Sequence, residues 1–329
     1  MNTTPGTFKP SSKPSPPSPA PSGYTVVGGP GSPGREGCGF SLILLNRGGT
    51  MSRSDALEDF EKLRPDEIIS LENPGGALLM ESLAARFPRV RFILFHQAVS
   101  PGERINIAMR EARGPLAAVL WSDMKALPSG FPEGAVRDVQ DSGILCTTPW
   151  FYSRENESMP VLQIPAFQKK KLKVLSVLPA REISSTLFPY DYCGIYSREK
   201  FLSIGGYDPG IRGPWWQKAD LGLRALLWGE KIVSSRLLRV SASETAPAED
   251  TGADSGYRMF FLKNLAVRLG PQGGKLSRAS FFPFFLHSGC GLPAALAEFR
   301  LCRRWVSENS PRFQKDALSV ISQWETPSE

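Results

Sequence analysis

Short runs of apolar residues alternate along this chain with longer stretches in which apolar positions recur every three or four residues. The apolar runs cover residues 40–45, 67–71, 91–95, 117–121 and 143–146. The run 40–45 is almost continuously apolar, which is typical of a strand that is buried on both faces. Between the first two runs, Leu57, Phe60 and Leu63 lie three positions apart among acidic residues, which predicts an amphipathic helix.

The alternation of strands and helices predicts an α/β fold, with a mostly parallel central sheet and helices on both faces. Ligands of such sheets bind in the crevice outside the carboxyl ends of the strands. We therefore expect the chemistry of this protein just after Leu45, Leu71, Phe95 and Trp121.

The pattern divides the chain into three regions. Residues 1–36 are rich in Pro, Ser, Gly and Thr and contain too little apolar surface to offset the entropy of ordering, so they are predicted to form a disordered tail. The alternating pattern occupies residues 37–245, which we assign to one α/β domain with a long connection between 150 and 190. Helical stretches dominate afterwards, so residues 246–329 are predicted to form a helical extension.

The composition is that of a globular protein, with 41% hydrophobic and 22% charged residues. A net charge of +7 is compatible with a phosphate-bearing ligand, with a membrane surface or with no anionic partner. No basic stripe is interleaved with stacking aromatic residues, which argues against nucleic acid as a partner. The five cysteines form no CxxC pair and the N-terminus carries no apolar segment of the secretory type, so we expect a cytoplasmic protein.

Two basic segments leave contact with a membrane open. Residues 169–173 contain four lysines, which either form a solvated face or meet an anionic acceptor or membrane. Residues 279–305 contain four closely spaced phenylalanines with arginines on both sides, but prolines and glycines interrupt the segment, so it is no spanning helix. Core packing of these phenylalanines and peripheral docking at the inner face of a membrane are both compatible with the pattern.

Acidic residues follow two of the predicted parallel strands. Glu72 comes directly after 67–71, and Asp123 comes two residues after Trp121. A carboxylate at a strand end can accept a hydrogen bond from a base or ribose, or ligate a divalent cation that bridges a diphosphate. Capping of a helix or a solvated turn is the simpler alternative for each acid.

A longer pattern in the second half of the chain is more specific. It consists of Arg198–Asp208 (REKFLSIGGYD), Ala219–Arg224 (ADLGLR) and Trp228–Ile232 (WGEKI). This order resembles the second half of family 2 glycosyltransferases, which have an arginine-led helix, a GGFD-like turn and an acidic pair before a DLxxR helix. The first half agrees, because Asn106–Gly114 is similar to the RNxGxxxAxG helix and Val119–Asp123 to the strand that ends in the DXD element.

The resemblance implies a GT-A fold that binds a nucleoside-diphosphate sugar and transfers the sugar to a glycan, lipid or protein acceptor. Glu72 takes the position of a family aspartate near the nucleotide base. Asp123 corresponds to the last acid of the DXD element, which coordinates Mg²⁺ or Mn²⁺ on the diphosphate. The residues implied in nucleotide-sugar binding are Glu72, Asn73, Asn106, Asp123, Trp215 and Trp216. For the two tryptophans, stacking on a sugar ring and packing over the sheet are equally compatible.

The chain departs from the family pattern at two catalytic places. Trp121 replaces the first DXD acid, and the acidic pair that supplies the general base falls at Gln217 and Lys218. A general base needs a carboxylate or an imidazole within reach of the acceptor hydroxyl. Asp220 and Asp208 are the nearest candidates, although Asp220 also suits a helix N-cap and Asp208 a turn.

Two hypotheses therefore stand. The first is an enzyme that transfers a sugar from a nucleotide donor by an inverting displacement, as the resemblance implies. The second is a degenerate relative that binds a nucleotide sugar or supports a partner enzyme without turnover.

Overall fold

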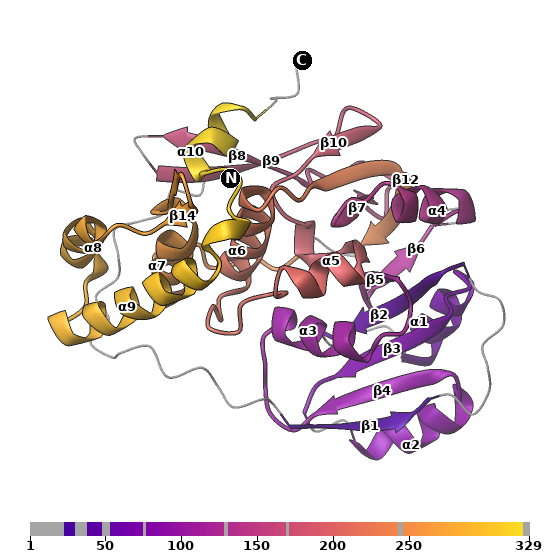
Figure 1. Cartoon of the computed structure of the whole chain (residues 1–329). Helices are drawn as coiled ribbons and strands as arrows, with labels where there is room; N and C mark the ends of the chain where they lie inside the picture. Colours follow the sequence, from indigo (N-terminus) through magenta and orange to yellow (C-terminus); the bar gives the residue numbers. More distant parts are fainter. Residues whose placement is uncertain are drawn as a thin grey trace.

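One mixed β-sheet organises the computed structural model of this protein (Figure 1). The structure describes residues 23–29, 38–47, 53–74, 77–127, 131–168, 171–242 and 246–324. The strands of the large sheet are β1 (Tyr24–Gly28), β2 (Phe40–Leu45), β3 (Glu67–Glu72), β4 (Val90–Phe95), β5 (Leu116–Trp121), β6 (Met124–Ala126), β7 (Cys146–Tyr152), β10 (Ile183–Ser185), β11 (Gly194–Ser197) and β12 (Ile232–Ala242).

The strand order is β1-β4-β3-β2-β5-β11-β7-β12-β10, with β6 paired to β12 beside this path. Strands β4, β3, β2 and β5 are mutually parallel. Strand β11 is antiparallel to both its neighbours, and β7 and β12 are parallel to each other. The predicted α/β class with a mostly parallel central sheet is confirmed.

The apolar runs form the central strands of the sheet because these strands are buried. Every residue of β2 and of β5 is buried, as expected for strands covered on both faces. The covering helices are α1 (Arg53–Glu61), α2 (Ala77–Arg86), α3 (Pro101–Glu111), α4 (Glu133–Asp141), α5 (Arg198–Ser203) and α6 (Pro214–Leu227). Helix α3 shows a local start signal, because Ser100 accepts a hydrogen bond from the Glu103 amide and Pro101 fixes the first turn.

The last part of the chain is mainly helical, as predicted, but it also contains a small hairpin. Its elements are α7 (Ser255–Phe260), the π-helical turn η2 (Phe261–Leu265), β13 (Arg268–Gly270), β14 (Gly273–Lys275), η3 (Arg278–Ser280), α8 (Phe281–Ser288), α9 (Leu292–Glu308), η4 (Ser310–Arg312) and α10 (Ala317–Ser322). Buried Phe260 and Leu262 join this region to the main core. The extension therefore packs on the α/β domain as part of the same hydrophobic core.

The long connection predicted between 150 and 190 contains regular structure of its own. Strands β8 (Leu162–Gln168) and β9 (Lys171–Val177) pair as an antiparallel hairpin, separate from the large sheet. Part of the basic segment lies in β9, whereas Lys169 and Lys170 lie outside the described residues.

Strand β1 lies within residues 1–36, the region that the sequence predicted to be a disordered tail. Residues 24–28 pair antiparallel with residues 91–95 of β4 at the edge of the sheet (Figure 1). The Tyr24 hydroxyl donates to Glu111 at 3.0 Å, and the Thr25 hydroxyl contacts the ring nitrogen Nε2 of His96 at 2.9 Å. The pairing forms because a short β-branched run lies against the free edge of β4. The sequence did not indicate this strand, because prolines and glycines surround the run. Residues 1–22 and 30–37 lie outside the described residues.

Candidate functional site

The carboxyl ends of the parallel strands bring charged residues from distant parts of the chain to one edge of the sheet. Arg47 follows β2, Glu72 ends β3, and Trp121 ends β5 with Asp123 just beyond it. A short 3-10 turn, η1 (Tyr190–Tyr192), places Asp191 beside them. That chemistry takes place after these strands stays a prediction. Arg47 and Asp191 lie among the predicted residues, although the sequence did not indicate them.

Arg47 lies between two carboxylates. Its Nε is 3.0 Å from Oδ2 of Asp123, and its Nη2 is 2.7 Å from Oδ2 of Asp191. The guanidinium also lies over the Trp121 ring, 4.0 Å from the ring centre, an arrangement that attracts a cation to the π face. The Trp121 indole N–H donates to the Asp191 carbonyl at 2.9 Å. Trp121, which replaces an acid of the DXD pattern, thus supports an arginine here.

The alternating charges of Asp123, Arg47 and Asp191 continue with Lys218 near the start of α6. The ammonium of Lys218 is 2.8 Å from Oε2 of Glu249, and its positive charge also acts on Asp191. We call Asp123, Arg47, Asp191, Lys218 and Glu249 the charge row. Acids and bases alternate along it, and the three carboxylates exceed the two cations by one charge.

Asp191 is held in an unfavourable environment. Burial raises the pKa of Asp191 above its usual value, and the nearby Arg47 and Lys218 only partly oppose this effect. Its backbone φ is 48°, and that of the next residue, Tyr192, is 65°, so two successive residues with side chains adopt the left-handed conformation. Backbone strain of this kind persists where the surroundings impose it, and it often accompanies function.

Glu72 and Asn73 lie at the expected strand end, but neighbouring side chains already hold both. Buried Glu72 forms an ion pair with Arg53 and accepts from Asn46 at 2.9 Å. The Asn73 amide donates to the Asn46 carbonyl at 3.2 Å, and its oxygen accepts from Arg104. Their contact with a nucleotide base stays a prediction.

Arg104 is a site residue that the sequence analysis missed. Its guanidinium donates to neutral acceptors, the carbonyls of Val99 and Asn46 and the side chain of Asn73, and within the described ranges it makes no ion pair. Burial lowers the pKa of Arg104, and the charge of Glu72 opposes that shift. An arginine in the first turn of the helix after β4 is the sequence signal that could have found it.

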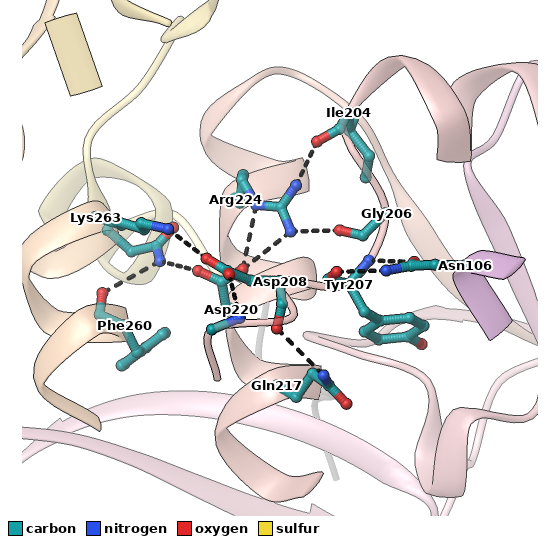
Figure 2. A network of polar contacts seen from close by, with 12 residues as sticks. Asn106, Ile204, Gly206, Tyr207, Asp208, Gln217, Asp220, Arg224, Phe260 and Lys263 are labelled. Atoms are coloured by element: carbon teal, nitrogen blue, oxygen red, sulfur yellow. Dashed lines mark hydrogen bonds and ion pairs between the residues drawn. The ribbon is translucent and has the colours of Figure 1, made fainter. Parts of the chain in front are cut away.

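Asn106 joins α3 to the glycine turn before α6 (Figure 2). Its Nδ2 donates to the Tyr207 carbonyl at 2.6 Å, and its Oδ1 accepts from the Tyr207 amide at 2.8 Å. Gly206 has a φ of 63° and packs so closely on Asn106 that a Cβ would overlap it. This pair of bonds gives Asn106 a structural role, and its contact with a ligand stays a prediction.

Asp220 lies at the centre of the network in Figure 2. It is fully buried, and its oxygens are bonded by Nη2 of Arg224 at 2.9 Å and by Nδ2 of Asn264 at 2.8 Å. Arg224 also donates to the Gly206 carbonyl at 2.6 Å. Asp220 is in the middle of α6, which excludes the N-cap alternative. As described, this carboxylate has no access to an acceptor hydroxyl.

Asp208 is also tied to the protein. It forms an ion pair with Lys263 and accepts from the Gly210 amide at 2.9 Å. Burial acts to raise the pKa of Asp208, but the Lys263 ammonium holds it below the usual value. The turn interpretation is therefore supported, and catalysis by Asp208 stays a prediction.

Gln217 and the two tryptophans occupy the start of α6. Gln217 is fully buried and accepts from the Gly102 amide and the Tyr192 hydroxyl, each at 3.1 Å. Trp216 is buried and donates to the Gly252 carbonyl at 2.8 Å, so it packs in the core. Trp215 is half-buried. For these two tryptophans the sequence left sugar stacking and packing over the sheet open, and of the two only Trp215 is partly exposed to solvent.

Few of the side chains at this site could bind a metal ion. Asp123 is the predicted ligand, and its carboxylate forms an ion pair with the guanidinium of Arg47. Among the residues that the structure describes, no group of three or more His, Cys, Asp or Glu side chains is arranged to hold an ion. The side chains present do not amount to a metal centre.

Neither a family model nor a curated protein matches the sequence. Among solved structures, GalNAc-T7 with UDP, GalNAc and Mn²⁺ superposes with a TM-score of 0.55 and 12% identity, over 89% of this chain and 59% of that one. S. aureus TarS gives 0.44 and 13%, over 62% and 36%, and its residues 1–349 with UDP-GlcNAc give 0.46 and 13%, over 64% and 59%. This chain thus spans about three fifths of the GalNAc-T7 structure. With the strand order above, the GalNAc-T7 match establishes a GT-A-like fold, the fold of nucleotide-sugar glycosyltransferases.

Proposed function

We propose that this protein transfers a sugar from a nucleoside-diphosphate sugar to an acceptor by an inverting displacement. The observation that carries the proposal is the charge row at the carboxyl ends of β2 and β5, in the crevice where sheets of this kind bind ligands. GalNAc-T7 was solved with UDP, so UDP-sugars are the first donors to test.

Arg104 is the cation best placed to meet the donor. It contacts Asn73 and lies near Glu72, and its present partners carry no charge. A diphosphate would gain a charge-assisted hydrogen bond from such a guanidinium. Glu72 and Asn73 then face the base, and the ring of Trp215 is available to the sugar.

Whether the reaction uses a divalent cation is a separate proposal. GalNAc-T7 was solved with Mn²⁺, and Asp123 is the residue proposed to bind Mg²⁺ or Mn²⁺ here. Such an ion would neutralise charge on the leaving diphosphate. Because the side chains around Asp123 do not form a metal centre, we derive no step through an ion.

The acceptor is proposed to be a glycan, a lipid or a protein. A cytoplasmic location, with peripheral contact to a membrane through residues 279–305, remains part of this proposal. None of the described helices is long and apolar enough to cross a bilayer.

A second candidate is a protein that binds a nucleotide sugar without transferring it. Gln217 and Lys218 favour it, because an amide engaged in the core and an ammonium cannot act as general bases.

Thermal unfolding with a panel of UDP-, GDP- and dTDP-sugars, with and without Mn²⁺, tests both candidates. A donor that binds only the folded protein at about 100 times its Kd adds about 2.7 kcal/mol to the free energy of unfolding. Stabilisation by one nucleotide class, followed by release of the nucleoside diphosphate, supports transfer. Binding without release favours the second candidate, and no stabilisation by any donor contradicts both.

A further inference from the structure

Glu249 places a carboxylate at the start of α6. The family pattern has its acidic pair there, and this chain has Gln217 and Lys218 at those two positions instead. Lys218 Nζ lies 3.0 and 2.8 Å from the two oxygens of Glu249. We propose that Glu249 is the general base of the reaction, an inference that rests on the proposed sugar transfer.

The loop that carries Glu249 is anchored on both sides of it. Before it, the Tyr190 hydroxyl is hydrogen-bonded to the backbone at Ala246. After it, the Gly252 carbonyl accepts from the Trp216 indole at 2.8 Å, and Ala253 is buried. With Lys218 bonded to its side chain, Glu249 has the fixed position that proton transfer requires.

The other acids near this place are less suited to the task. Asp220 is fully buried in its ion pair with Arg224, and Asp208 is bound to Lys263. Asp191 is almost wholly buried beneath Arg47. The side chain of Glu249 is 20% exposed, so a hydroxyl can reach it while Lys218 still holds it.

Buried aromatic rings beside Lys218, the partner of Glu249, connect this place to the half-buried Trp215. Lys218 Nζ lies 5.8 Å from the ring centre of Phe188 and 5.1 Å from that of Tyr192. Phe188 packs edge-on against Trp215 with ring centres 5.8 Å apart. A half-buried tryptophan and a partly exposed carboxylate thus share one neighbourhood, a combination suited to a saccharide with its apolar face and its hydroxyls.

The step is a displacement at the anomeric carbon of the donor. The Glu249 carboxylate takes the proton of the acceptor hydroxyl as the acceptor oxygen bonds to the anomeric carbon. The bond from that carbon to the diphosphate breaks, and its electron pair leaves with the nucleoside diphosphate. Without a sugar acceptor, water reacts in the same way, so slow hydrolysis of the donor reports on the same base.

The experiment measures UDP release from UDP-GlcNAc and UDP-GalNAc, together with donor affinity by calorimetry, for the full chain and three variants. Glu249→Gln removes the base and keeps the shape of the side chain. Glu249→Asp retains a carboxylate. Glu298→Gln is the matched control, because Glu298 is a buried acid paired with Arg258 at 3.0 Å on α9.

We expect Glu249→Gln to release UDP 100- to 10,000-fold more slowly with donor affinity unchanged, the usual range for a general base. Glu249→Asp should recover part of the rate, and Glu298→Gln should keep the wild-type rate per folded molecule. Wild-type activity that survives in Glu249→Gln overturns this inference and leaves the proposed transfer standing. Donor binding without UDP release by the wild type overturns both the base and the transfer.

Discussion

Asp191 shows how a single residue of the candidate site can oppose stability. Its pKa is raised by burial, so the folded protein favours the protonated acid more than the unfolded chain does. A raised folded-state pKa contributes stability that is complete at low pH and is lost as the pH rises through that value. At neutral pH the ionised Asp191 therefore lowers the free energy of unfolding.

Replacement of Asp191 by Asn should consequently stabilise the protein more at pH 7 than at pH 4. The amide removes the buried charge, and Arg47 retains Asp123 as a partner. Urea unfolding at the two pH values measures the difference between variant and wild type. An advantage that is equal at both pH values, or larger at pH 4, would contradict the assigned pKa direction.

Asp220 leads to the opposite expectation. Asp220→Asn leaves Arg224 buried without its carboxylate and should lower the free energy of unfolding by about 3–5 kcal/mol. Chemical denaturation measures this loss, with Asp316→Asn at the N-cap of α10 as a comparison. Unchanged stability together with abolished transfer would instead give Asp220 the catalytic role.

The sequence predicted some residues of the site and missed others. Acids at strand ends were found because their position follows from the strand pattern alone. The contact of Arg47 with Asp191 spans 144 positions and that of Lys218 with Glu249 spans 31, and neither pairing has a local signal. The sequence therefore predicted that the site lies at the carboxyl ends of the parallel strands. Only the fold showed which charged residues pair with one another there.

At the scale of elements, helix α6 packs against the segment before η1 through a glycine. A Cβ at Gly222 would overlap the Leu187 carbonyl oxygen and the Phe188 side chain. Gly222→Ala should lower the free energy of unfolding by about 1–3 kcal/mol, because backbone cannot move aside as a flexible side chain can.

Gly134 in α4 is the matched control for that prediction. A Cβ there meets no atom within 4 Å, so Gly134→Ala should be neutral or stabilising by up to about 1 kcal/mol. Thermal unfolding of both variants separates packing from helix propensity. Equal effects of the two substitutions would show that α6 does not depend on this close approach.

Elements were predicted well where burial alone determines them. Strands β2, β3, β4 and β5 correspond to short, mainly apolar runs, and such runs have few alternatives in a buried sheet. Strand β1 and the β8–β9 hairpin were missed because their formation depends on a distant or antiparallel partner, and their sequences alone carry no continuous apolar signal.

For the whole molecule, the far end of the C-terminal region carries an exposed apolar face. On α8, which is labelled in Figure 1, the structure leaves Phe282 71% and Leu286 77% exposed, one turn apart, while Phe284 is buried. Exposed Arg278 and Arg300 flank them in the sequence. Phe284 is thus packed in the core, and docking of exposed Phe282 at a membrane stays a prediction.

A double substitution, Phe282→Ser with Leu286→Ser, should weaken binding to vesicles of anionic lipid at least tenfold. Burial of such side chains contributes about 1.5–3 kcal/mol each, and the arginines add attraction that salt screens. Vesicle co-sedimentation measures binding, and Ile183→Ser, an equally apolar exposed position on β10, is the control. Equal binding by both variants would exclude α8 as the docking element.

Strand β1 has a practical consequence for any shortened form of this protein. A chain that begins at residue 37 omits β1, and the backbone amides and carbonyls of β4 that pair with β1 would then face solvent, while those that pair with β3 stay bonded. An uncovered apolar strand is a template for pairing with another molecule. Such a form would tend to self-associate through its sheets, and this would mimic a natural oligomer in solution.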